Sequence, residues 1–317
     1  MEQRKKESGI RLEDVAAGYG RKALLNHISL HVSPGNVLTL IGPNGAGKST
    51  ILKTVTRQLA ELGGTIFLEG TAMSRMREEE VARTLAMVMT ERLHPEFMTC
   101  REVVATGRYP YTGRLGILSA EDWKLVDDAM QLVHARDTAD RNFSQISDGQ
   151  RQRVMLARAI CQEPRILILD EPVDGLDPVM RRQIWSIILS EVAEKEMTVL
   201  VSSHNLRELE DVCDHVGIMH HGKIMIERSL SDLQGSVSKI QVACQSGMPK
   251  LPEHFQVLHM ANTGRVYTMI VKGDPKEAEA ALSYCNPTIV DVLPLTLEEI
   301  FIYEMGGADY EVKDILF

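Results

Sequence analysis

The chain has 317 residues, of which 44% are hydrophobic and 25% are charged, and its formal net charge is −9. This length allows roughly two domains and a sizeable core. The acidic balance argues against a broad nucleic-acid surface, which normally carries a basic excess, so we expect no nucleic-acid partner. The five cysteines are widely spread without a Cys-x-x-Cys pair, which predicts neither a zinc site nor a disulfide framework and fits a reducing cytosol.

The N-terminus is charged and lacks an apolar stretch, so we expect no signal peptide. No window approaches the roughly 20 apolar residues that a membrane helix needs. If the protein works at a membrane, we therefore expect another chain to span it.

The first part of the chain predicts strands that lead into a phosphate-binding loop. Residues 10–32 are typical of strands, and residues 28–32 alternate with period two. The apolar run 37–41 precedes residues that fill the pattern G-x-x-x-x-G-K-[ST], namely Gly42, Pro43, Asn44, Gly45, Ala46, Gly47, Lys48 and Ser49. A buried strand, a glycine loop and a helix in this order direct backbone N–H groups at a phosphate chain. Lys48 adds a positive charge, and the Ser49 hydroxyl can reach a magnesium ion.

The middle of the chain predicts an α/β domain with a helical insert. We expect a helix over residues 50–62 that ends at Gly63 and Gly64, followed by a strand over 65–69, a helix over 77–84 and a buried strand over 85–89. The insert, at about residues 92–160, contains predicted helices separated by a loop over 107–116. The apolar runs 166–169 and 198–201 are typical of central parallel strands.

The last part predicts a hairpin and then a change of character. His220, His221 and Gly222 separate two predicted strands, 216–219 and 223–226. From about residue 233, predicted strands over 240–243, 255–259 and 266–271 and helices over 274–284 and 296–303 indicate a small α+β appendage.

Three groups of residues outside the phosphate loop point to chemistry. Asp170 and Glu171 end a predicted parallel strand, where Asp170 can hold magnesium and Glu171 can orient or deprotonate a water molecule. His204 ends the next strand and could reach a γ-phosphate on the same sheet edge. Ser147 can cap a helix whose first N–H groups suit an anion, together with Asp148, Gly149 and Gln150.

Over roughly residues 10 to 230, these motifs together resemble the nucleotide-binding subunit of an ATP-binding cassette (ABC) transporter. Residues 42–49 match its Walker A motif, and residues 166–170 with Glu171 match Walker B and its catalytic glutamate. Residues 147–150 resemble its signature, with Asp148 where glycine is more usual. Residues 174–177 resemble the D-loop that contains Asp177, His204 resembles the switch histidine, and Tyr19 resembles the aromatic residue that stacks on adenine.

The resemblance implies a P-loop NTPase fold with a mixed sheet core, an antiparallel β subdomain and a helical insert. It implies an ABC domain over residues 8–232 and an accessory α+β domain over 233–317. It also implies ATP as the cofactor, bound by residues 42–50 including Thr50, and Mg²⁺, held by Ser49 and Asp170. Since one domain's signature completes the other's phosphate site in this family, a homodimer or a paralogous second nucleotide-binding domain is expected. An integral-membrane permease would hold the chain at the cytoplasmic face of the cell membrane.

Two features depart from the family pattern, and the second leaves the transport direction open. Thr90 and Glu91 follow the strand at 85–89, where the family usually has a glutamine that takes part in coupling to the membrane subunit. Residues 85–130 resemble importers of iron–siderophore, haem or cobalamin, whereas residues after about 172 resemble multidrug or lipid exporters, as does the appendage at 295–301. The chain could be a natural mosaic or a joining of two sequences near residues 163–172.

The leading hypothesis is an ATPase that energises a membrane transporter, with import of an iron complex slightly favoured and export of drugs or lipids as the alternative. A soluble ABC ATPase of translation or DNA repair is less favoured, because the chain has neither two cassettes nor long coiled coils and is acidic. A third hypothesis is a regulatory nucleotide-binding module without turnover, which the residues at positions 90 and 91 keep open.

Overall fold

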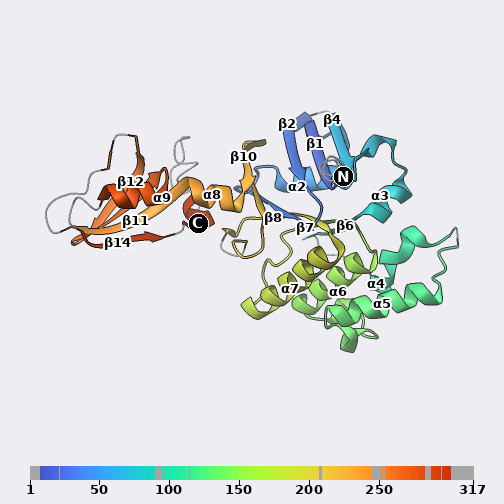
Figure 1. The fold of residues 1–317 in the computed structure, drawn as a ribbon. Coiled ribbons are helices and arrows are strands. Elements are labelled where there is room, and N and C mark those ends of the chain that lie inside the picture. Colours follow the sequence, from blue (N-terminus) through green and yellow to red (C-terminus); the bar gives the residue numbers. More distant parts are fainter. Residues whose placement is uncertain are drawn as a thin grey trace. The chain divides into compact units, whose positions relative to one another are not determined.

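The computed structural model describes residues 8–20, 22–89, 95, 97–113, 115–206, 209–244, 251–252, 254–282, 287–293 and 295–300. The chain folds into two compact units, and we describe each by itself (Figure 1). The first contains Met1–His204 and Gly217–Glu227, and the second contains Asn205–Val216 and Arg228–Phe317. Over the described ranges, no helix is both long and apolar enough to cross a membrane.

A six-stranded sheet forms the centre of the first unit. Its strands, in spatial order, are β10 (Lys223–Ser229), β9 (His215–His220), β3 (Val37–Ile41), β8 (Thr198–Ser203), β7 (Ile166–Asp170) and β6 (Leu85–Val88). Strands β3, β8, β7 and β6 pair in parallel. Every residue of β3, β7 and β8 is buried, which explains their continuous apolar sequences. The carboxyl ends of these three strands therefore meet at one edge of the sheet.

An antiparallel sheet packs with the helix after β3 to form the hydrophobic core of this unit. Its order is β2 (Lys22–Val32), β1 (Ile10–Tyr19), β4 (Glu61–Leu68) and β5 (Thr71–Ala72). Alternate residues of β2, such as Ile28 and Leu30, are buried, as the period-two pattern predicts. They join a core that includes Ile51 and Leu52 of α2 (Lys48–Val55).

The helix expected over residues 50–62 is wrong at its C-terminal end. Helix α2 ends at Val55, and Arg57 adopts a positive φ of 59°. Gly63 and Gly64 belong to β4 instead of ending a helix. A Cβ on Gly64 would lie 2.4 Å from the Asp14 carbonyl oxygen, so glycine permits close approach of two strands here.

The expected helical insert lies between β6 and β7. It contains α4 (Cys100–Ala105), the 3₁₀ helices η2 (Thr106–Tyr111), η3 (Arg136–Thr138) and η4 (Phe143–Gln145), and the helices α5 (Ala120–Leu132) and α6 (Asp148–Cys161). Helix α6 packs against α4 and α5 (Figure 1). The first half of the loop expected over 107–116 is thus the 3₁₀ helix η2.

Two further helices frame the first unit. Helix α3 (Glu78–Thr84), preceded by η1 (Met73–Arg75), leads into β6. Helix α7 (Pro178–Lys195) was not predicted from the sequence, because its apolar residues do not form one stripe along the helix.

A buried arginine anchors the insert. Arg108 of η2 is 6% exposed, and its guanidinium donates to Asp122 Oδ1, Glu163 Oε2 and the Cys161 carbonyl oxygen, each at 2.9 Å. Asp122 belongs to α5, Cys161 ends α6, and Glu163 follows that helix. One side chain therefore connects three parts of the insert.

The second unit is an α+β sandwich of one sheet and one main helix. Its antiparallel sheet has the order β12 (Gln256–Thr263), β13 (Val266–Lys272), β11 (Val237–Cys244) and β14 (Pro287–Leu293). Ile240 and Val242 of β11 pack with Leu282 of α9 (Pro275–Leu282) in its core. Helix α8 (Leu230–Ser236) precedes this sheet. The sequence predicted β11, β12, β13 and α9 but not β14 or α8, and the helix expected over 296–303 extends beyond the described residues.

Candidate functional site

The phosphate loop contains glycines that lie close to other parts of the chain, one against backbone and one against a side chain. Gly47 precedes α2 with φ 106°, and no side chain caps this helix end. A Cβ on Gly47 would lie 2.3 Å from Leu25 Cδ2, and one on Gly42 would lie 2.3 Å from the Met219 carbonyl oxygen. Only glycine fits both positions, so the backbone N–H groups at the start of α2 remain open toward an anion.

Lys48 is the cation at the centre of this loop. It is 6% exposed, and its Nζ donates to the carbonyl oxygens of Gly42 at 2.7 Å and Pro43 at 3.3 Å. Burial lowers the pKa of the Lys48 ammonium, and the Glu171 and Asp170 carboxylates act in the opposite direction. An anion in the loop would give Lys48 the charged partner that the two carbonyl oxygens lack.

Asp170 and Ser49 bring two hard oxygen ligands together at the sheet edge. The Ser49 hydroxyl donates to Asp170 Oδ1 at 3.2 Å, and the Ser202 hydroxyl donates to the same oxygen. Register explains the second contact, because Asp170 of β7 pairs with Ser202 of β8. A carboxylate and a hydroxyl fit Mg²⁺, which takes few protein ligands and completes its octahedron with water and substrate phosphates.

The described residues contain no cluster of three His, Cys, Asp or Glu side chains that could hold a metal ion unaided.

Glu171 and His204 meet at the same edge. Glu171 has φ 48°, a left-handed conformation that costs a non-glycine residue about 1–3 kcal/mol, and its backbone N–H donates to the Ser202 carbonyl oxygen at 3.1 Å. This conformation aims the side chain at His204, whose Nδ1 lies 3.1 Å from Glu171 Oε1. A partly exposed carboxylate beside an imidazole can hold and deprotonate a water molecule.

Lys48, Ser49 and Glu171 line a cavity of about 420 Å³, whereas Asp170, Ser202 and His204 do not line it. The cavity is lined by most of the predicted phosphate-binding residues, by Glu171 and by four residues that sequence reasoning did not assign to it: Leu24, Leu25, Asn44, Gly45, Ala46, Gly47, Lys48, Ser49, Thr50, Glu171, His221 and Gly222. Tyr19, expected to stack on adenine, ends β1 with 54% exposure and does not line this cavity.

The expected signature residues lie at the start of α6 and do not line the cavity. Ser147 caps the helix by accepting from the Gln150 backbone N–H at 3.3 Å, and Gln150 Oε1 accepts from the Ser147 N–H at 3.1 Å. Asp148 forms an ion pair with Arg151 at 2.6 Å. A Cβ on Gly149 would lie 2.9 Å from Met180 Cε. Within this single chain, the motif is a complete capping box.

Two further predicted positions complete the account. Asp177 is the N-cap of α7, where its Oδ1 accepts from the backbone N–H groups of Val179 at 3.0 Å and Met180 at 3.1 Å. Thr90 and Glu91, at the position of the family's glutamine, lie outside the described residues.

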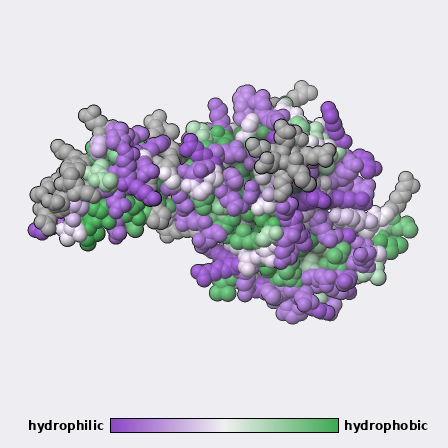
Figure 2. Space-filling model, in the orientation of Figure 1, coloured by the Kyte–Doolittle hydropathy of each residue, from purple (hydrophilic) through white to green (hydrophobic). Residues whose placement is uncertain are grey.

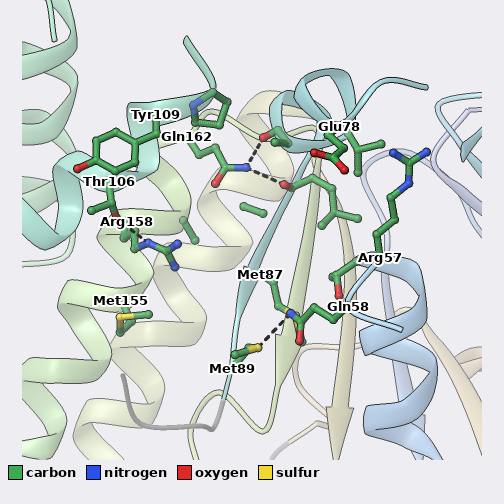
Figure 3. Close-up of a pocket in the computed structure, with 17 residues that line it drawn as sticks. Arg57, Gln58, Glu78, Met87, Met89, Thr106, Tyr109, Met155, Arg158 and Gln162 are labelled. Carbon is green, nitrogen blue, oxygen red and sulfur yellow. Dashed lines mark hydrogen bonds between the residues drawn. The ribbon is translucent and has the colours of Figure 1, made fainter. Parts of the chain in front are cut away.

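A second, larger cavity of about 620 Å³ lies between the sheet edge at β6 and the insert (Figure 3). We call it the β6 groove; its walls come from the end of α2, from α3, β6, η2 and α6. Its lining is largely apolar and rich in methionine, with Met87, Met89 and Met155. At one wall, the Gln58 amide donates to Met89 Sδ at 3.2 Å.

Two arginine side chains line the β6 groove with different partners. Arg158 of α6 donates from Nε to Thr106 Oγ1 at 2.9 Å, and burial lowers the pKa of its guanidinium. Arg57 donates to the carbonyl oxygens of Met73 and Met76. Figure 3 shows Arg158 beside Thr106 and Met155, away from Arg57 and Glu78.

Comparison with known proteins bears out the resemblance. The family model described as ABC transporter matches residues 25–174. The chain is 35% identical to an uncharacterized ABC transporter ATP-binding protein of Methanocaldococcus jannaschii over 216 residues, 68% of this chain and 74% of that protein. It is 31% identical to the iron(3+)-hydroxamate import ATP-binding protein of Bacillus subtilis, covering 68% of this chain and 80% of that protein. It is 33% identical to the Nod factor export ATP-binding protein I of Paraburkholderia xenovorans, covering 73% and 74%.

Solved structures agree. One described as the ATP-binding subunit of an ABC transporter superimposes with a TM-score of 0.64 at 27% identity, covering 71% of this chain and 91% of the other. This likeness confirms the predicted P-loop NTPase fold, with its mixed sheet, antiparallel sheet and insert. The chain therefore belongs to the ABC transporter family as an ATP-binding subunit, one of the ATP-hydrolysing components of these transporters.

Proposed function

We propose that this subunit binds ATP and Mg²⁺ in the 420 Å³ cavity and hydrolyses ATP there to drive a transporter for an iron complex or a similar cargo. One observation carries the placement of the reaction. Lys48, Ser49, Asp170, Glu171 and His204, from three neighbouring strand ends, converge on one edge of the sheet.

Each of these side chains has a place in the hydrolysis of ATP. Lys48 and the N–H groups of α2 hold the phosphate chain, while Ser49 and Asp170 would hold Mg²⁺, which neutralises charge on the phosphates. Glu171 orients a water molecule and takes its proton as the water oxygen bonds to the γ-phosphorus atom and the bond to ADP breaks. His204 supports Glu171 and contacts the γ-phosphate.

Two copies would complete the site. The residues 147–150 cap α6 and leave the cavity of their own chain without a contact from the signature. We infer that the signature of a second nucleotide-binding domain, in a homodimer or a paralogous pair, faces the phosphates bound by this chain. Asp177 would take part in the same interface.

The membrane subunit would dock in the β6 groove. An apolar groove lined by flexible methionines suits a helix of another protein. Beside it, Tyr109 is 54% exposed, and Figure 2 shows apolar residues over the connection between η2 and α5, where Leu115 and Ile117 are 84% and 72% exposed. Such exposed apolar residues typically mark an interaction site. The chain would thus be peripheral at the cytoplasmic face of the cell membrane, held by a permease, without a nucleic-acid partner.

Iron-complex import is favoured by the relative named for iron(3+)-hydroxamate import and by the importer-like sequence of residues 85–130. Export of drugs or lipids is the second candidate, because the relative named for Nod factor export is of similar identity. A soluble ATPase or a regulatory module has no comparable support among these relatives.

A pull-down of the tagged chain from its native membrane tests this proposal. Mild detergent and identification of the polytopic subunit that co-purifies distinguish the candidates, with the Glu171→Gln variant as a second bait that should retain its complex with ATP. A siderophore-type permease supports import, and an exporter-type subunit overturns it. ATP hydrolysis by the purified chain that persists in Glu171→Gln would overturn the role of Glu171.

A further inference from the structure

The hairpin of β9 and β10 forms one wall of the nucleotide cavity. His221 and Gly222, its two turn residues, line the same cavity as residues 44–50 of the phosphate loop and α2. A Cβ on Gly222 would lie 2.3 Å from the Leu24 carbonyl oxygen and 3.4 Å from Leu25 Cδ2. The same Leu25 methyl group contacts Gly47 of the phosphate loop, so the turn and the loop are packed on one side chain.

The backbone of this turn is unusual for a histidine. His221 has φ 45° and Gly222 has φ 73°, so this two-residue hairpin requires left-handed conformations at both positions. Asparagine, aspartate and glycine are preferred at the first position, and another residue is strained there. A strained side chain that lines a ligand cavity points to a role in binding.

The imidazole of His221 is oriented by its neighbour. The rings of His220 and His221 have centroids 3.9 Å apart and are tilted by 49°. His220 is half-buried, whereas His221 is exposed at the cavity. An imidazole N–H here meets a cavity whose other wall is built to bind phosphates.

We propose that His221 donates a ring N–H to an oxygen of the bound nucleotide, from its phosphate chain or its ribose. The contact would add a side-chain donor opposite the phosphate loop and would make His221 a determinant of nucleotide affinity. This proposal rests on the proposed placement of ATP in the 420 Å³ cavity.

The test uses the full chain and compares the nucleotide affinity of His221 variants with that of a control variant. His221→Asn and His221→Gly suit the left-handed turn, so both should fold with an unchanged or higher melting temperature. Calorimetric titration should nevertheless show ATP binding about fivefold to tenfold weaker, as expected for a lost hydrogen bond to a charged or strongly polar group. His134→Asn, at an exposed histidine that has a similar left-handed backbone and does not line this cavity, is the matched control and should leave ATP affinity within about twofold.

Inorganic tripolyphosphate as a second ligand identifies the oxygen. Weaker tripolyphosphate binding in the His221 variants assigns the contact to the phosphate chain, and unchanged tripolyphosphate binding with weaker ATP binding assigns it to the ribose. ATP affinity in His221→Asn and His221→Gly equal to that of the unmodified chain overturns the proposal. Lys48→Ala separates the two proposals, because retained ATP affinity in that variant would instead overturn the placement of ATP.

Discussion

The nucleotide cavity and the β6 groove, both in the first unit, differ in how their walls are fixed. The nucleotide cavity is built from backbone: Gly42 and Gly47 pack against other main-chain or core atoms, and Lys48 is held by two carbonyl oxygens. The β6 groove is built from side chains, with Met87 and Met89 in its lining. A cavity with backbone walls suits one small ligand that is always the same molecule, whereas methionine side chains can adapt to a protein surface.

The two sites also differ in the partners of their charged side chains. At the sheet edge, Asp170 accepts from two hydroxyl groups and Glu171 lies beside His204, so charged groups have polar partners before a ligand binds. In the β6 groove, the partly buried guanidinium of Arg158 donates to the neutral hydroxyl of Thr106. The first arrangement is preorganised for chemistry, and the second suits completion by a carboxylate of the docked partner.

The largest expected effect lies in the nucleotide cavity. Glu171→Gln should lower the ATP turnover of the chain by about 10²–10⁴-fold, because an amide cannot take the proton of the attacking water. ATP binding should persist, so that ATP and Mg²⁺ trap a dimer detectable by gel filtration. A monomer under these conditions would contradict the two-copy site.

Lys48→Ala should weaken ATP binding by about 100-fold, since the phosphates lose their buried cation and its charge-assisted hydrogen bonds. Isothermal titration of the full chain measures the loss. Lys124→Ala, on the exposed surface of α5, is the matched control and should bind ATP normally. Equal affinities in the two variants would remove Lys48 from the site.

Arg158→Met should separate the groove from the nucleotide cavity. Removing a partly buried charge whose partner is a neutral hydroxyl should raise the melting temperature by about 2 °C, corresponding to less than about 1 kcal/mol. Co-purification of the membrane subunit should fall about tenfold if a partner carboxylate meets the guanidinium. In contrast, Arg57→Met loses two bonds to carbonyl oxygens and should lower the melting temperature. Undiminished co-purification with Arg158→Met would place the docking surface elsewhere.

The last prediction concerns the stability of a wall of the β6 groove. Gln162 donates to the carbonyl oxygens of Ala82 and Leu85, as Figure 3 shows, so Gln162→Met should destabilise the chain by about 1–2 kcal/mol. Gln58→Met, which removes bonds to sulfur only, should cost less. Denaturant unfolding measures both, and ATP affinity should stay within twofold in each. A change of affinity in Gln162→Met would mean that the groove and the nucleotide cavity are coupled without a partner.

The sequence predicted the nucleotide edge better than the rest of the molecule, for a physical reason. The structure of residues 37–49 is determined largely by their own sequence, because a continuous apolar strand followed by a glycine loop is compatible with few other conformations. Gly63 and Gly64 were misassigned because a glycine pair ends a helix as readily as it admits a neighbouring strand. Nothing local identifies the roles of Arg158 or His221, whose surroundings come from segments distant in sequence. Gly47 and Gly222, which both lie against Leu25 in the folded chain, could have indicated the proposed His221 contact only once the fold was known.

The glycine contacts of the nucleotide cavity also restrict which amino-acid substitutions are tolerated at these positions. At Gly42 and Gly222, any side chain would place its first carbon 2.3 Å from a backbone carbonyl oxygen, a contact that no rotamer relieves. In a library of all single substitutions selected for transport, variants at Gly42 and Gly222 should therefore be depleted about as strongly as variants at Lys48. Position 221 should instead tolerate asparagine and glycine in any selection for folding alone. Such selections would therefore mark more positions as essential than those that contact the nucleotide, because the hairpin turn and the phosphate loop depend on packing against the same neighbours.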